Sequence, residues 1–140
     1  MKKTFALSLL AAIAVIGFTS CEKTPKGILE GSVYMTKDGG SGRVIRNSST
    51  GEIAKLDFKI SFTTDKDCNL SFVFPEGKTY VRYDGTYTVS EPLDDESREV
   101  VINTNITKFD ITEFLGDLSP DKSRITGDLG SHPCVLYKQK

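Results

Sequence analysis

Apolar and polar side chains alternate along several short stretches of this 140-residue chain, and this period of two constrains the fold more than any other feature. The clearest stretch has apolar residues at every second position, namely Leu56, Phe58, Ile60 and Phe62. Successive side chains of a β-strand point to opposite sides, so the pattern predicts a strand with one buried face. The same alternation in residues 70–74 predicts a second strand of this kind.

Further strands are expected where residues with high β propensity lie between turn-forming residues. They cover residues 28–35, 80–83, 86–89, 100–102, 124–126 and 134–137. Residues 63–69 and 75–78 are polar or contain Pro and Gly, which predicts turns there. Asp84 and Gly85 separate two of the expected strands and predict a tight hairpin, because both central residues of such a turn need a positive φ.

One segment, residues 111–118, departs from the alternation. Its apolar residues have the spacing of one helix face, Ile111, Phe114, Leu115 and Leu118. Asp110 stands where a helix N-cap would be, and Glu113 follows three residues later, as in a capping box. We therefore expect one or two helical turns here. A strand through Phe109, Ile111 and Glu113 fits nearly as well and remains the alternative.

The first twenty residues differ in character from the rest of the chain. Lys2 and Lys3 precede an uncharged apolar run at residues 5–18. This run is shorter than the about 20 residues that a helix needs to cross a bilayer. A charged start, a short apolar run and small residues after it are typical of a secretory signal peptide.

The end of this leader, Phe18-Thr19-Ser20-Cys21, resembles the lipobox of bacterial lipoproteins, although Phe18 stands where that family usually has Leu. The resemblance implies that residues 1–20 are a signal peptide, that Cys21 carries the lipid, and that residues 21–27 form a tether. Two or more acyl chains hold a protein on a bilayer essentially permanently. The predicted location is the outer membrane, on the periplasmic face because no acidic cluster follows Cys21. An ordinary secreted protein with a chance cysteine is the alternative.

The remaining residues, 28–140, are expected to form a single β-rich domain. Loss of Lys2 and Lys3 with the leader leaves 16 of the 18 basic residues against 19 acidic ones. This mildly acidic balance, with no basic block, does not favour nucleic acid as a partner, and none is expected. Short strands at regular spacing, hairpin after hairpin, predict an all-β fold, a small antiparallel up-and-down barrel, with a β-sandwich as the alternative.

The lipobox, the meander of strands and the stretch Tyr83-Asp84-Gly85-Thr86-Tyr87-Thr88-Val89 resemble the small lipocalin-like (calycin-type) lipoproteins of Bacteroidota-type bacteria. The resemblance implies a β-barrel. True lipocalins often carry a Trp near their start, whereas this chain has none.

No catalytic residues, metal ligands or cofactors are expected. A nucleophile and base mechanism would depend on His132, the only histidine. Asp65, Asp67 and Asn69 with Glu76 imitate a calcium loop, but Leu70 stands where that loop needs Gly. These residues therefore predict a polar hairpin tip.

Two cysteines remain once Cys21 is acylated. Cys68 and Cys134 would lie in an oxidising compartment, where they either form a disulfide or are buried singly.

Three side chains, Tyr80, Arg82 and Tyr87, form the candidate binding surface. The predicted hairpin would place Arg82 opposite Tyr87. The favoured alternative is that these pairs only stabilise the sheet. We expect a non-catalytic binding or accessory domain, tethered to the membrane by lipid, for a small ligand, a glycan or an envelope protein. A structural subunit of an outer-membrane protein assembly is the alternative, and an enclosed apolar cavity of about 300 Å³ or more would favour a ligand carrier.

Overall fold

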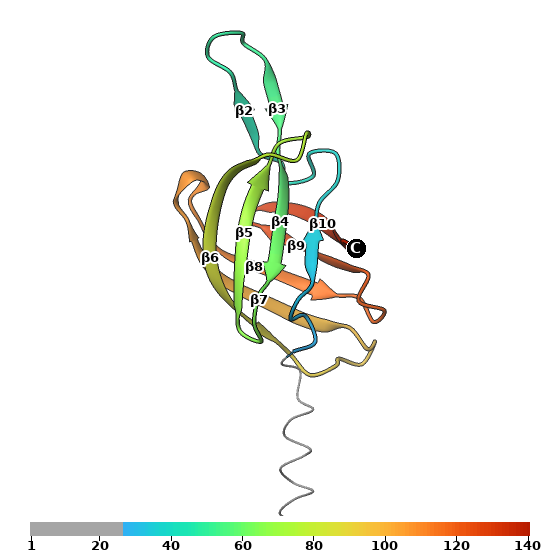
Figure 1. The fold of residues 1–140 in the computed structure, drawn as a ribbon. Helices are drawn as coiled ribbons and strands as arrows, with labels where there is room; N and C mark the ends of the chain where they lie inside the picture. The colour runs from blue at the N-terminus through green and yellow to red at the C-terminus, as the bar shows by residue number, and fades with distance from the viewer. Residues whose placement is uncertain (1–26) are drawn as a thin grey trace, which may run out of the picture.

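The computed structural model describes residues 27–140, which form a closed antiparallel barrel of eight strands with a separate two-stranded hairpin at one end (Figure 1). This architecture confirms the predicted all-β, up-and-down barrel. The predicted signal peptide, the lipidated Cys21 and the tether as far as residue 26 lie outside the described residues. Within residues 27–140, no helix is long and apolar enough to cross a membrane.

The barrel is a meander whose consecutive strands pair from β4 to β10, and β1 closes it by pairing with both β10 and β4. Its strands are β1 (Val33–Met35), β4 (Asp57–Phe62), β5 (Asp67–Val73), β6 (Thr79–Val89), β7 (Arg98–Ile106), β8 (Ile111–Leu118), β9 (Arg124–Leu129) and β10 (His132–Lys138). The short 3-10 helix η1 (Thr107–Phe109) connects β7 to β8. The extra hairpin consists of β2 (Val44–Arg46) and β3 (Ile53–Lys55).

The two ends of the barrel are different. We call one the entry end, because the described chain enters there; it also holds the loops 63–66, 90–97 and 119–123. The other is the arm end, from which the β2–β3 hairpin projects well beyond the barrel (Figure 1). We call residues 44–55 the arm.

The apolar positions of the alternating strands form the core, as expected from the sequence. In β4 the side chains of Phe58, Ile60 and Phe62 are buried, and the residues between them are only partly buried. An inward-facing row of this kind removes apolar surface from water at about 25 cal/mol per Å², so the period of two stabilises the closed sheet directly.

The predicted hairpin at Asp84-Gly85 is wrong, because β6 runs through both residues as one strand of 11 residues. Gly85 does not have a positive φ and makes no turn. A Cβ at this position would lie 2.8 Å from the Leu70 Cδ1 atom and 2.9 Å from the Asn103 carbonyl oxygen. Glycine is therefore needed here for the close approach of neighbouring strands, not for a turn.

The predicted helix at residues 111–118 is also wrong, because these residues form β8. The pairing of β7 with β8 shifts register, since Asn103 pairs with Glu113 while Ile106 pairs with Ile111. The irregularity leaves two successive β8 residues exposed, so the buried Ile111 and Phe114 are three positions apart. A bulge therefore produced the spacing that imitated a helix. Asp110 has φ 55° and ends η1 instead of capping a helix.

Elsewhere, some strand boundaries in the structure differ from those expected from the sequence. The expected turn at residues 63–69 is shorter, because β5 begins at Asp67, and the expected strand at residues 28–35 shrinks to Val33–Met35. The arm was not predicted, since each of its strands has only three residues. Its turn is held by the Asn47 side-chain oxygen, which accepts a hydrogen bond from the Ser49 backbone at 2.9 Å.

Candidate functional site

The barrel interior is filled with side chains at its middle. Phe58 of β4 and Phe114 of β8 come from strands four places apart in either direction around the eight-stranded barrel, yet their ring centroids are only 5.7 Å apart. Phe72 packs against Phe58 at 5.3 Å. Rings that meet across the barrel axis occupy the space in which a lipocalin-like carrier would hold its ligand, so a binding site has to be sought on the outside.

The predicted surface of Tyr80, Arg82 and Tyr87 is not brought together, because the hairpin that would have paired these residues does not exist. Tyr87 is buried, and its hydroxyl donates a hydrogen bond to the Thr64 carbonyl at 2.6 Å. Arg82 is exposed on the outer wall. Tyr80 packs edge-on against Phe74, with ring centroids 5.6 Å apart.

The two described cysteines are separate, buried free thiols, so the disulfide alternative is not formed in this structure. Cys68 pairs with Phe62 in the β4–β5 ladder, at the entry end. Cys134 lies two residues after His132, whose ring would contact a Cβ on Gly42, near the start of the arm. The two thiols are therefore at opposite ends of the barrel. Within the described part of the chain, no three His, Cys, Asp or Glu side chains gather into a metal site.

Burial raises the pKa of the Cys68 thiol to about 12, with a further contribution from the Asp67 and Asp84 carboxylates, and it raises the pKa of Cys134 to about 11. An unfolded thiol has a pKa of about 8.5. Both native thiols therefore stay protonated where unfolded thiols ionise. We expect a Cys21→Ser chain to show no thiol labelling by a disulfide reagent at about pH 8 when folded, and to label fully in guanidinium chloride.

The same shifts predict how stability depends on pH. The pKa values of both thiols are higher in the folded than in the unfolded chain. The contribution of the two thiols to the free energy of unfolding is therefore fully present below about pH 8.5 and is lost as the pH rises toward the folded pKa values. The free energy of unfolding should therefore fall between about pH 9 and pH 11. Rapid labelling of the folded chain, or stability that increases over this range, would contradict the prediction.

The two most exposed large apolar side chains among the described residues both lie on the arm. Val44 is 52% exposed and Ile53 is 55% exposed. Val44 pairs with Lys55 and Arg46 pairs with Ile53, so these four side chains share one face of the hairpin. This face therefore presents two apolar side chains, Val44 and Ile53, next to two positively charged ones.

The other face of the arm is turned toward the barrel. Ile45 is partly buried and packs against the core. Arg43, just before β2, donates a hydrogen bond to the Leu129 carbonyl at 3.4 Å, and its guanidinium lies 5.7 Å from the centre of the Phe109 ring. These contacts fix the base of the arm on the barrel while its tip projects.

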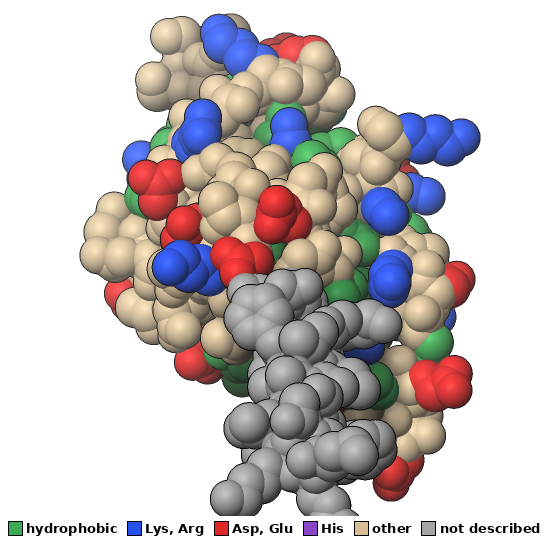
Figure 2. Space-filling view, turned by 60° about the horizontal axis from the view of Figure 1, so that its bottom comes forward, with side chains coloured by type: hydrophobic (Ala, Val, Ile, Leu, Met, Phe, Trp, Pro, Cys, Tyr) green, Lys and Arg blue, Asp and Glu red, His purple; other side chains and the backbone are tan. Residues whose placement is uncertain are grey.

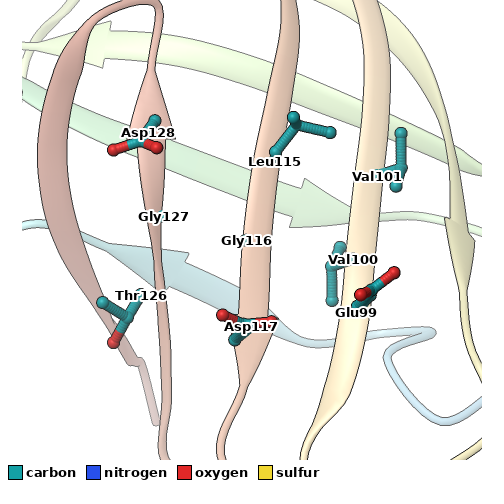
Figure 3. A pocket seen from close by; sticks show the side chains of 9 residues that line it. All are labelled: Glu99, Val100, Val101, Leu115, Gly116, Asp117, Thr126, Gly127 and Asp128. Atoms are coloured by element: carbon teal, nitrogen blue, oxygen red, sulfur yellow. The ribbon is translucent and has the colours of Figure 1, made fainter.

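Two of the hollows on the outside of the barrel each lie over three adjacent strands. The first, which we call the acidic hollow, has a volume of about 290 Å³ and lies over β7, β8 and β9. Its floor is the backbone around the paired Gly116 and Gly127 (Figure 3). Its rim includes the carboxylates of Glu99, Asp117 and Asp128.

The second, which we call the polar hollow, is larger, with a volume of about 690 Å³, and lies over β5, β6 and β7 around Gly85. Its rim consists of amides, hydroxyls and carboxylates, from Thr63, Asp67, Asn69, Asp84, Thr86, Asn103 and Asn105. This site could not be predicted from the sequence, because most of its residues lie on three different strands and the predicted hairpin turn stood at its centre.

Comparison of the chain with protein-family models, with curated proteins and with solved structures finds no match. The resemblance to lipocalin-like lipoproteins therefore stays a prediction from the sequence.

Proposed function

We propose that this protein is a lipid-anchored, non-catalytic docking domain of the cell envelope, and that the arm binds a partner protein. The observation that carries the proposal is the projecting face of the arm, with Val44 and Ile53 about half exposed. Exposed apolar side chains that lie together on the surface of a protein often mark an interaction site.

The position of the arm supports this function. The described chain enters at one end of the barrel, and the arm projects from the other (Figure 1). If Cys21 carries the lipid, the barrel stands between the membrane and the arm. The loop 90–97 at the entry end is rich in acidic residues and has no basic one. Figure 2 shows both acidic and basic side chains around the entry point, but acidic residues outnumber basic ones in the three loops of this end. This end would not attract an anionic bilayer, which leaves the arm free to face away from it.

The chemistry of the arm indicates the kind of partner. Arg46 and Lys55 share the face of Val44 and Ile53, so a complementary surface is apolar with acidic side chains around it. Each arm strand pairs only with the other, which leaves an unpaired edge on both. An extended segment of the partner could add to either edge as a further strand.

A structural role in an outer-membrane protein assembly is the second candidate. It is favoured by the packed middle of the barrel, because a barrel whose centre is filled with side chains is suited to acting as a rigid spacer. A stoichiometric neighbour that stays bound through purification would favour the structural role, and a partner that exchanges would favour docking.

We expect the double substitution Val44→Asp and Ile53→Asp to abolish partner capture. Loss of apolar anchors at the centre of an interface costs about 1–2 kcal/mol each, or about 30-fold or more in affinity for the pair. The measurement is site-specific photo-crosslinking from position 46 in intact cells, followed by identification of the linked protein.

The matched control is Leu93→Asp, which also places a charge on an exposed apolar residue, 43% exposed, but in the entry-end loop. It should leave crosslinking unchanged, and both variants should unfold at the same temperature as the parent. Crosslinking that survives the double substitution, or that is lost equally in the control, would refute docking through the arm.

A further inference from the structure

We propose that the polar hollow binds a neutral, hydroxyl-rich glycan. This site is separate from the arm and does not depend on the docking function. At about 690 Å³ the hollow falls within the range of about 300–1,000 Å³ that small-molecule sites occupy.

The floor of the hollow is strand backbone. Gly85 pairs with Cys68 on one side and with Thr104 on the other, and this row faces inward. Cys68 is buried, and the Thr104 hydroxyl donates a hydrogen bond to the Asp84 carbonyl at 3.1 Å. Because the side chains of this row point inward, only strand backbone faces outward here, and the two outward-facing rows on either side border the depression.

Those two rows supply the polar groups. Asp67 pairs with Thr86, and Thr86 pairs with Asn103, so these three side chains form one row across β5, β6 and β7. Asn69 pairs with Asp84 in the next outward row. Strand positions of this kind hold their side chains more firmly than loops do, as a pre-organised site requires.

Part of the rim is already ordered by its own hydrogen bonds. In the orientation of the Asn69 amide in which both of its polar atoms form hydrogen bonds, the amide nitrogen donates to an Asp84 carboxylate oxygen at 2.7 Å. The amide oxygen then accepts a hydrogen bond from Arg82 at 2.9 Å. This network orients the Asp84 carboxylate and places a positive charge near it, so that it can accept a hydrogen bond from a ligand.

The rest of the rim is available to a ligand. Among the hydrogen bonds formed within residues 27–140, none involves the side chains of Thr86, Asn103 or Asn105. All three are exposed. An amide offers donors and an acceptor, and a hydroxyl offers both as well. The hollow therefore presents both donors and acceptors from adjacent strands.

The chemistry of this rim selects the class of ligand. Asp67 and Asp84 oppose an anionic ligand, such as a phosphate or a uronate. No large apolar side chain is exposed in the hollow, so a lipid or an aromatic ligand finds no surface to contact. Sugar hydroxyls are both donors and acceptors, which is what the amides, hydroxyls and ordered carboxylate complement. Since no aromatic ring lines the hollow, the affinity should be weak, in the millimolar range.

The test is a titration of the full-length ¹⁵N-labelled chain in phosphocholine micelles with three neutral oligosaccharides, maltotriose, cellotriose and triacetylchitotriose. Trigalacturonate serves as the anionic comparison. We expect at least one neutral trisaccharide to move the backbone amide signals of Asn69, Gly85 and Thr86, whereas trigalacturonate leaves them in place. The double substitution Asn103→Ala and Asn105→Ala should weaken this binding by about fivefold or more.

The matched control is Asp117→Ala with Thr126→Ala, an outward-facing pair from the acidic hollow. It should bind the same trisaccharide as the parent does. The proposal is overturned if none of the neutral oligosaccharides shifts these signals, if the Asn103 and Asn105 variant binds unchanged, or if trigalacturonate binds more tightly. Because both variants leave the arm intact, none of these outcomes affects the docking proposal.

Discussion

Phe114→Ala is expected to lower the free energy of unfolding by about 3–5 kcal/mol, the range for removing a large aromatic side chain from a packed core. Phe114 is fully buried and contacts Phe58 across the barrel. The closed sheet cannot collapse into the space that the ring leaves, because its diameter is set by eight hydrogen-bonded strands. A domain of this size is stable by only about 5–15 kcal/mol, so the loss is a large fraction of the total.

Urea unfolding of the full chain, followed by circular dichroism, measures this loss as a lower midpoint at unchanged slope. The control is Leu115→Ala, one position along the same strand, where the side chain is 49% exposed. It should cost less than about 1 kcal/mol. Equal losses in the two variants would mean that Phe114 does not fill the centre of the barrel.

Gly127→Ala is expected to destabilise the β8–β9 pairing by about 3 kcal/mol, at the top of the usual range for an overpacked site. A Cβ at this position would lie 2.2 Å from the Leu115 carbonyl oxygen and 2.6 Å from the Gly116 Cα atom. Both are backbone atoms, so no side-chain rotation relieves the contact. The strands have to separate, and the ladder hydrogen bonds around the Gly116–Gly127 pair lengthen.

Amide hydrogen exchange measures this effect strand by strand. We expect exchange in the variant to be faster than in the parent, with a larger increase in β8 and β9 than in β4 and β5. The control is Gly51→Asn in the turn of the arm, where φ is 75° and no atom lies within 4 Å of an added Cβ. Asn tolerates this conformation better than most residues, so the change should be small. If Gly127→Ala is as stable as this control, β8 and β9 do not approach as closely as described.

Docking through the arm and glycan binding in the polar hollow share one structural premise, which these two substitutions test. A barrel with a filled centre and tightly paired walls binds through its outside, at the arm or in a wall hollow. If neither Phe114→Ala nor Gly127→Ala lowered the free energy of unfolding, the interior would not be closely packed, and a ligand inside the barrel would be expected instead.

The amino-acid sequence alone was enough to predict the fold class and most of the strands. The alternation in residues 56–62 correctly predicted β4 and its buried face, and the turn at residues 75–78 lies where it was expected. The reason is physical: when one face of a strand is buried, the period of two is imposed on the sequence position by position. The leader and the lipidation of Cys21 are also predictions from sequence, and they lie outside the described residues.

The roles of Gly85 and of the irregular spacing in residues 111–118 became clear only from the closed barrel. Asp84-Gly85 has the composition of a hairpin turn, but Gly85 lies inside β6 because a neighbouring carbonyl leaves no room for a Cβ. Residues 111–118 have the spacing of a helix because a bulge in the partner strand offsets the inward positions by one residue. Both features depend on which strand lies alongside, and local sequence does not carry that information. The polar hollow depends on it too, since its rim comes from three strands that meet only in the closed barrel.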